Sequence, residues 1–153
     1  MISPVIYAVA NSDKLTETEY ENARNIVSVS RRERAEKYRR REDSFRSLIA
    51  EVLVKFTIKK LGFTDYNQVL FSANQYGKPQ ANIEGFHFNV SHSGSWVVCA
   101  ADSLDVGVDV ERIHKVDTGI AKRFFSQEES ELLAHCTSES QWQDLFFKLW
   151  SLK

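Results

Sequence analysis

The sequence predicts an α+β fold, because helical and strand-like patterns occupy separate blocks of the chain. Residues 16–61 carry helical spacing, residues 69–111 carry short apolar runs between turn residues, and residues 120–150 return to helical spacing. A chain of 153 residues can form one or two compact lobes. We therefore expect helices packed on antiparallel strands.

The first third of the chain predicts one strand and three helices. Val5, Tyr7 and Val9 alternate in a strand over residues 2–10. Thr16 and Glu19 form a capping box that opens a helix toward Val27, and a second, charged helix follows over 31–39. The third helix ends at Gly62, and its apolar residues share one face that we expect in the core: Phe45, Leu48, Ile49, Val52, Leu53, Phe56 and Leu61.

The remaining elements are shorter. Apolar runs predict strands over 69–72, 86–90, 96–101 and 106–111, paired antiparallel. Helices are predicted over 120–125 and 126–135 and again near Ser140. The polar turn at 102–105 is the one soft boundary.

Composition narrows the class of partner and the compartment. Lys and Arg number 20 against 21 Asp and Glu, so the net charge favours neither nucleic acid nor an anionic membrane. Residues 31–46 hold eight basic and four acidic residues, which predicts a solvated face and argues against nucleic-acid binding. No segment resembles a secretory signal or a membrane helix, and the two cysteines form no CxxC motif. We expect a soluble protein in the reducing cytoplasm.

Two carboxylates stand out in the predicted strand over 106–111. Side chains alternate along a strand, so Asp109 and Glu111 share a face opposite the three valines. An ordinary half-exposed strand accounts for this pattern. The functional alternative is a magnesium site, because Mg²⁺ is held by one or two carboxylates together with phosphate oxygens.

Three basic or hydroxyl-bearing segments offer groups for a phosphate. Ser91 and His92 lie in a predicted turn that ends at Gly94, and Lys78 lies in the turn Tyr76-Gly77-Lys78-Pro79. Each turn has an ordinary structural explanation. Arg46 adjoins the core residue Phe45, so we expect it to point into a cleft and bind phosphate.

Several enzyme classes are excluded or left open by the motifs. The chain has no G-x-S-x-G elbow and no Walker A loop, which excludes a serine hydrolase of that kind and a P-loop enzyme. Glu129 completes a capping box with Ser126, which is a sufficient structural role. It is also a candidate general base if it faces the metal.

Five ordered segments resemble the motifs of Sfp-type 4'-phosphopantetheinyl transferases. They are Tyr-Gly-Lys-Pro at 76–79, Phe-Asn-Val-Ser-His-Ser-Gly at 88–94, Gly-Val-Asp-Val-Glu at 107–111, Lys-Arg-Phe-Phe-Ser at 122–126 with Glu129, and Trp-Ser-Leu-Lys at 150–153. The resemblance implies a pseudo-dimer of two α+β halves with antiparallel sheets, here 1–103 and an incomplete 104–153. Family members bind coenzyme A between such halves.

The resemblance also implies an activity and a set of roles. The protein would transfer the phosphopantetheine arm of coenzyme A to a serine of an apo acyl or peptidyl carrier protein, with magnesium as cofactor, and release adenosine 3',5'-bisphosphate. Asp109 and Glu111 match the metal-binding acids, and Glu129 matches the acid that activates the serine. The residues matched to nucleotide and phosphate binding are Arg46, Lys78, Ser91, His92, Arg31 and Arg34.

One departure from the family concerns the last residues. The family motif continues past Trp-x-x-Lys with a third metal-binding glutamate and a lysine, whereas this sequence stops at Lys153. We expect a fragment that turns over slowly or not at all. The alternative function is a non-catalytic protein- or nucleotide-binding module, and the oligomeric state is left open.

Overall fold

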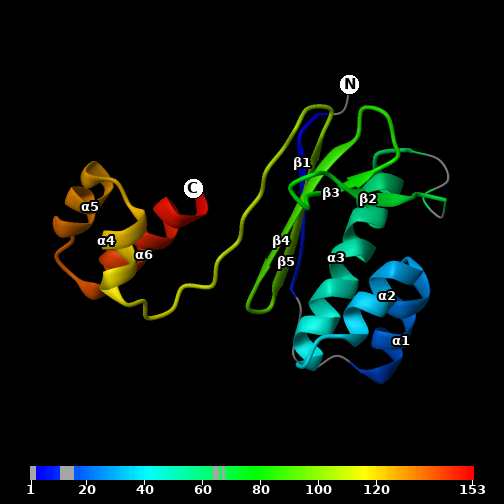
Figure 1. Ribbon diagram of the computed structural model, residues 1–153, viewed down its shortest axis with the longest axis horizontal. Coiled ribbons are helices and arrows are strands. Elements are labelled where there is room, and N and C mark those ends of the chain that lie inside the picture. The colour runs from blue at the N-terminus through cyan, green and yellow to red at the C-terminus, as the bar shows by residue number, and fades with distance from the viewer. Residues whose placement is uncertain (1–2, 11–15, 64–65, 67) are drawn as a thin grey trace. The chain divides into compact units, whose positions relative to one another are not determined.

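The computed structural model describes residues 3–10, 16–63, 66 and 68–153, which form two compact units, Met1–Val110 and Glu111–Lys153. Helices and antiparallel strands are both present, so the predicted α+β class is confirmed (Figure 1). No helix in the described part of the chain is long and apolar enough to cross a bilayer.

The first unit contains two antiparallel sheets. The larger has the order β1-β5-β4, formed by Val5–Ala10, Trp96–Asp102 and His87–Ser93, with Cys99 of the central strand opposite Tyr7 and Val90. The smaller pairs β2 (Phe71–Ala73) with β3 (Pro79–Ala81). The expected first strand is confirmed from Val5 onward; its residue Ile2 lies outside the described residues.

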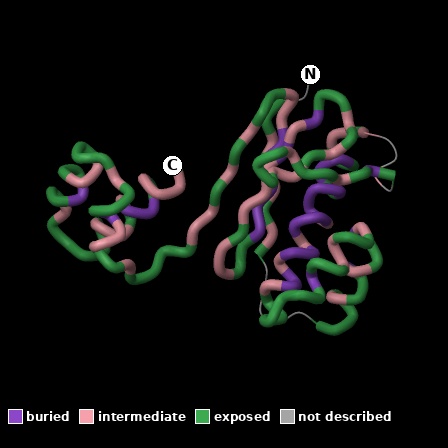
Figure 2. Tube along the Cα trace, in the orientation of Figure 1, coloured by how far each residue is buried: buried purple, intermediate pink, exposed green. Residues whose placement is uncertain are grey.

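Helix α3 (Arg41–Lys60) is the centre of the first unit. It packs against all three strands of the larger sheet on one side and against α1 (Glu17–Ile26) and α2 (Val29–Glu36) on the other (Figure 1). Because it is covered from two sides, it is buried along much of its length (Figure 2). The prediction of one buried apolar face is therefore only partly correct. Phe56, which belongs to that face, is exposed, whereas the polar residues Glu51 and Lys55 outside it are buried.

The regular secondary structure described in the second unit consists of helices. Following the extended residues 111–117, the helices are α4 (Thr118–Phe124), α5 (Gln127–Ala134) and α6 (Glu139–Ser151). Phe146 is the centre of their core, because its ring contacts those of Phe125, Trp142 and Trp150. The three predicted helices are confirmed.

Two local predictions were wrong. Residues 106–111 form no strand, although alternate residues from 106 to 110 are half-buried as in an extended chain. Ser91 and His92 do not lie in a turn, because β4 continues to Ser93 and the chain reverses at Gly94, whose φ is 58°. Both changes affect how the candidate site is built.

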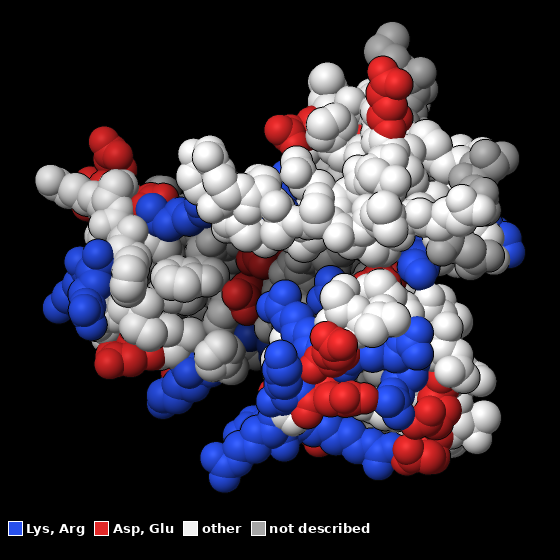
Figure 3. Space-filling view, turned by 45° about the vertical axis from the view of Figure 1, so that its right-hand side comes forward, with Lys and Arg blue, Asp and Glu red and all other residues white. Residues whose placement is uncertain are grey.

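The charged run 31–46, which spans α2 and the first turns of α3, contributes to a surface that carries both basic and acidic side chains. Basic and acidic atoms are interleaved over the helices of the first unit (Figure 3). Arg24 pairs with Glu21 and Glu36, and Arg41 pairs with Glu17. Exposed pairs of this kind contribute little stability, and they match the solvated face that the sequence predicted.

Candidate functional site

A cavity of about 200 Å³ lies in the first unit where α2, α3, β4 and the turn before β3 meet. Its polar lining residues are Arg31, Arg34, Tyr38, Ser47, Glu51 and His92. Three of these, Arg31, Arg34 and His92, are predicted site residues from segments about sixty residues apart in sequence. Two guanidinium groups beside an imidazole suit an anionic ligand.

Helix α2 presents two of its three arginines, Arg31 and Arg34, to this cavity. Ser28 caps the helix by accepting a hydrogen bond from the backbone N–H of Arg31 at 3.3 Å. Arg31 and Arg34 are three residues apart and so share a helix face. Arg31 is held by two hydrogen bonds: its Nε donates to Glu51 Oε2 at 3.2 Å and its Nη1 to Ser47 Oγ at 3.5 Å.

His92 reaches the cavity from β4. Phe88, Val90 and His92 alternate along the strand, so all three line the same cavity. Partial burial lowers the pKa of His92 below its ordinary value, and the positive charge of Arg46 lowers it further. The residue as a whole is nevertheless exposed to solvent. The imidazole is therefore biased toward its neutral form until an anion arrives.

Arg46 is held by two contacts within the first unit. Its Nη1 donates to the carbonyl of Gly94 at 2.8 Å, and Nη2 forms an ion pair with Asp43. These contacts join α3 to the β4–β5 turn. Arg46 is not among the described residues that line the cavity, but its positive charge lowers the pKa of His92, which does line it.

The segment 106–110 is tied to β4 by side chains rather than by a backbone ladder. Asn89 Oδ1 accepts from the N–H of Val108 at 2.9 Å, and Ser91 Oγ accepts from the N–H of Val110 at 3.3 Å. Ser91 Oγ also donates to Asp109 Oδ1 at 2.7 Å. This pattern explains why the segment is extended yet is not a strand, and it fixes Asp109 beside β4.

The two predicted metal ligands fall on either side of the division between the units. Asp109 belongs to the first unit and Glu111 to the second. Asp109 is exposed, and its carboxylate is oriented by Ser91. Within the described residues, no group of three His, Cys, Asp or Glu side chains gathers as a metal site. One or two carboxylates are nevertheless the donor set that Mg²⁺ takes when phosphate supplies the rest.

Lys78 lies apart from the cavity, although its neighbours Gly77 and Pro79 line it. The Nζ of Lys78 donates to the carbonyl of Val106 at 3.0 Å and lies 3.5 Å from Asp105 Oδ1. It borders a second hollow of about 210 Å³. The turn itself is shaped by Gly77, whose φ is 80°, and by Asn74, whose Oδ1 accepts from the N–H groups of Tyr76 and Lys78.

Glu129 has the structural role that its sequence context allowed. Its Oε2 accepts from the N–H of Ser126 at 2.7 Å, while Ser126 Oγ accepts from the N–H of Glu129 at 3.2 Å. The capping box is therefore confirmed. Lys153 Nζ lies 2.9 Å from the same carboxylate oxygen, and this contact, followed by the Ser126 hydrogen bond, lowers the pKa of Glu129. The group is ionised at neutral pH, as a proton acceptor must be.

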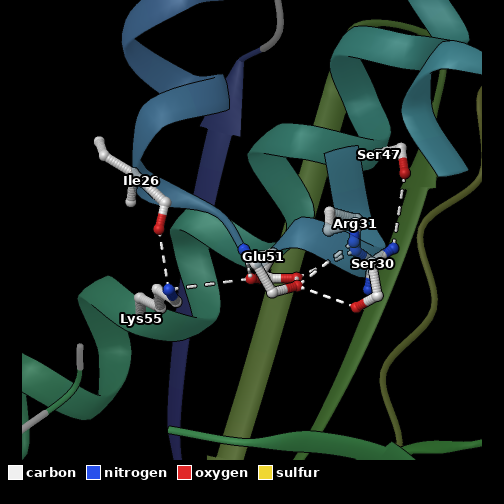
Figure 4. A network of polar contacts seen from close by, with 7 residues as sticks. Ile26, Ser30, Arg31, Ser47, Glu51 and Lys55 are labelled. Carbon is white, nitrogen blue, oxygen red and sulfur yellow. Dashed lines mark hydrogen bonds and ion pairs between the residues drawn. The ribbon is translucent and has the colours of Figure 1, made fainter. Parts of the chain in front are cut away.

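The sequence analysis missed a buried polar network beside Arg31 (Figure 4). Glu51 and Lys55 lie one turn apart on α3 and are 3% and 7% exposed. Lys55 Nζ donates to the carbonyl of Ile26 at 2.8 Å and lies 3.9 Å from Glu51 Oε1. The available signal was an acidic and a basic residue four positions apart inside the otherwise apolar stretch 48–56.

Comparison with known proteins gives matches along nearly the whole chain. Residues 14–104 match a family model described as 4'-phosphopantetheinyl transferase, N-terminal, and residues 105–153 match the 4'-phosphopantetheinyl transferase superfamily. The chain is 39% identical over 150 residues to "4'-phosphopantetheinyl transferase Sfp" of Bacillus subtilis (strain 168), which covers 97% of this chain and 66% of that protein.

Two further relatives extend the comparison. The chain is 40% identical over 142 residues to "4'-phosphopantetheinyl transferase psf-1" of Bacillus pumilus, covering 92% of this chain and 60% of the relative. It is 23% identical over 145 residues to the mouse "L-aminoadipate-semialdehyde dehydrogenase-phosphopantetheinyl transferase", covering 86% and 47%. The chain thus spans 66% or less of the length of each of these relatives. Because the N-terminal and superfamily models match consecutive segments, the chain belongs to the 4'-phosphopantetheinyl transferase family.

Proposed function

We propose that this protein transfers the 4'-phosphopantetheine arm of coenzyme A to a serine hydroxyl of an apo acyl or peptidyl carrier protein. The relatives' names describe transferases of this group, and the family models match residues 14–153. The expected family division at residue 103 is part of the proposal. So is a cytoplasmic location, which the two free thiols of Cys99 and Cys136 support.

The observation that carries the proposal is the pairing of functions on strand β4. His92 lines the cavity that also holds Arg31 and Arg34, and the adjacent residue Ser91 holds the carboxylate of Asp109. A diphosphate ester needs cationic donors for its phosphates and a centre that neutralises charge on the leaving group. Two consecutive residues of β4 serve these two requirements: His92 faces the cationic cavity, and Ser91 orients the carboxylate proposed to bind the metal.

The binding roles follow from the charges and contacts of each residue. In our proposal Arg31, Arg34 and His92 bind phosphate oxygens of coenzyme A, and Arg46 adds positive potential. Lys78 and the turn around it bind the nucleotide. Ser91 acts by orienting Asp109, with which it shares a hydrogen bond of 2.7 Å.

Asp109 and Glu111 are the proposed magnesium ligands. Bound magnesium would neutralise negative charge on the diphosphate and so favour its departure. The exposed carboxylate of Asp109 and the fixed position of its Oδ1 support this assignment, because a hard cation prefers pre-oriented carboxylate oxygens.

Glu129 is the proposed general base. The carrier serine would lose its proton to this carboxylate while its oxygen forms a new bond to the phosphorus next to pantetheine. The phosphorus–oxygen bond to the second phosphate breaks, and adenosine 3',5'-bisphosphate leaves with the electron pair. The lowered pKa of Glu129 supports an ionised acceptor, and Lys153 limits its basicity.

Titration calorimetry with coenzyme A tests the proposal against a non-catalytic interaction module. Each titration is run with magnesium and again with a chelator in its place. We expect binding that strengthens with magnesium. A module whose carboxylates have no metal role would bind equally in both titrations, and that result would refute the proposed function.

A further inference from the structure

The buried carboxylate of Glu51 holds the N-terminal end of α2 at three points. Its Oε1 accepts from the N–H of Ser28 at 2.6 Å, and its Oε2 accepts from Ser28 Oγ at 3.0 Å and from Arg31 Nε at 3.2 Å (Figure 4). Ser28 is the N-cap of α2, so the carboxylate contacts the cap and the first turn together. A negative charge at this end also complements the helix dipole.

Lys55 performs the opposite task one turn further along α3. Its ammonium donates to the carbonyl of Ile26, which is the last residue of α1. A cation at a helix C-terminus and an anion at the next helix N-terminus both interact favourably with the backbone dipoles. The pair therefore fixes the turn between α1 and α2 onto α3, and with it the position from which α2 meets the cavity.

The contact to Arg31 determines which part of its side chain remains for a ligand. Arg31 Nε, the guanidinium nitrogen nearest the side-chain stem, donates to Glu51, and Nη1 donates to Ser47 Oγ at a long 3.5 Å. The guanidinium is planar and presents its donors in a fixed fork. Holding one edge therefore sets the direction of the other nitrogens at the cavity that Arg31 lines.

A purely stabilising role accounts poorly for these buried charges. Removing a carboxylate and an ammonium from water is unfavourable, and apolar residues of similar size often give equal or greater stability at such positions. Within the described part of the chain, the three hydrogen bonds of Glu51 instead go to the segment that carries Arg31. This arrangement favours a role in setting the geometry of that segment.

We propose that Glu51 is a positioning residue for anion binding. By accepting the hydrogen bond from Arg31 Nε, it orients the guanidinium of Arg31 toward the phosphate groups of coenzyme A. The proposal rests on the proposed function, which assigns Arg31 to the substrate. Glu51 itself does not contact substrate in this account. It acts by removing rotational freedom from Arg31 before the ligand arrives.

The test is a double-mutant cycle on coenzyme A affinity, with the dissociation constant measured by calorimetry. Glu51→Gln keeps the size of the side chain but removes its charge, and we expect affinity to fall about tenfold. In the Arg31→Ala background the same substitution should change affinity by less than about twofold, because its target is gone. Glu33→Gln changes an exposed glutamate of α2, the helix that carries Arg31; it is the matched control and should bind as the wild type does.

The outcomes separate this inference from the proposed function. If wild-type protein binds coenzyme A and Glu51→Gln binds equally well, the positioning role is refuted and the proposed function stands. Equal losses in both backgrounds would also refute it, because they indicate a general structural effect. Absence of coenzyme A binding by the wild type would overturn the proposed function and this inference together.

A second variant covers the case in which Glu51→Gln does not fold. Arg31→Lys keeps a positive charge but lacks the Nε donor and the planar fork, and the Arg31 side chain is partly exposed, so we expect the fold to persist. Its coenzyme A affinity should fall about tenfold. Wild-type affinity in Arg31→Lys would show that orientation of the guanidinium is not needed and would contradict the proposal.

Discussion

Ser91 Oγ donates a 2.7 Å hydrogen bond to Asp109 Oδ1 and in turn accepts one from the N–H of Val110. A single hydroxyl thus fixes both the backbone and the carboxylate of a segment that has no ladder of its own. This contact connects the strand that lines the cavity with the acid proposed to bind magnesium.

Ser91→Ala should weaken magnesium binding without removing a metal ligand. The alanine can neither orient Asp109 nor accept the hydrogen bond from Val110, so the carboxylate loses its fixed position. We expect the magnesium concentration for half-maximal coenzyme A binding to rise about tenfold. Ser95→Ala, in the exposed turn after Gly94, serves as the control. An unchanged magnesium requirement in Ser91→Ala would remove Ser91 from the site.

His92 should make coenzyme A binding depend on pH. Burial and Arg46 lower its pKa in the free protein, whereas a bound phosphate favours the charged imidazole and raises the pKa. Binding then takes up a proton, so affinity should increase as the pH falls from about 8 to about 6 relative to a His92→Gln variant. The variant also controls for titration of the ligand's own phosphates. Parallel pH profiles for the two proteins would place His92 away from the ligand.

Glu129→Gln should separate binding from transfer. Glutamine can still accept the hydrogen bond from Ser126, so the helix start is preserved, but it cannot accept the serine proton. We expect the transfer rate to fall by about a hundredfold while coenzyme A affinity is retained. Glu128→Gln changes an exposed neighbour by the same chemistry and should leave the rate unaltered. Normal turnover by Glu129→Gln would restrict Glu129 to its capping role.

Lys153→Met should raise the pKa of Glu129 toward its ordinary value of 4.5, because the Lys153 contact is the largest cause of its depression. A folded-state pKa below the ordinary value means that Glu129 contributes stability above pH 4.5, and this contribution disappears as the pH falls through the lowered pKa. Carboxyl NMR titration measures the pKa directly. The variant should also lose less stability than the wild type on acidification, and an unmoved Glu129 titration would contradict the ion pair.

The sequence predicted those structural features that depend only on residues close together in the chain. Both capping boxes, Thr16 with Glu19 and Ser126 with Glu129, form as expected, and α3 ends just before Gly62, which adopts a φ of 80°. These features depend on residues within one turn of each other. For the same reason the antiparallel hairpin of β4 and β5 was predictable, apart from the position of its turn.

The site depended on contacts that no local pattern contains. An alternating run such as 106–111 predicts a strand, but the alternation is the same when the partners are the side chains of Asn89 and Ser91. Likewise, nothing near Lys78 indicates that its ammonium turns toward Val106 and away from the cavity. The cavity itself joins α2 to β4, and only the packing of α3 between them brings Arg31 near His92.

The assignment of Asp109 to the metal is tested by labelling an apo carrier protein from coenzyme A, comparing the wild type with Asp109→Ala, both in a full-length version of the protein. Mass spectrometry of the carrier reports the added phosphopantetheine arm. Magnesium-dependent labelling by the wild type that disappears in Asp109→Ala is the predicted result. Labelling that survives the loss of Asp109 undiminished would contradict the assignment of this carboxylate to the metal.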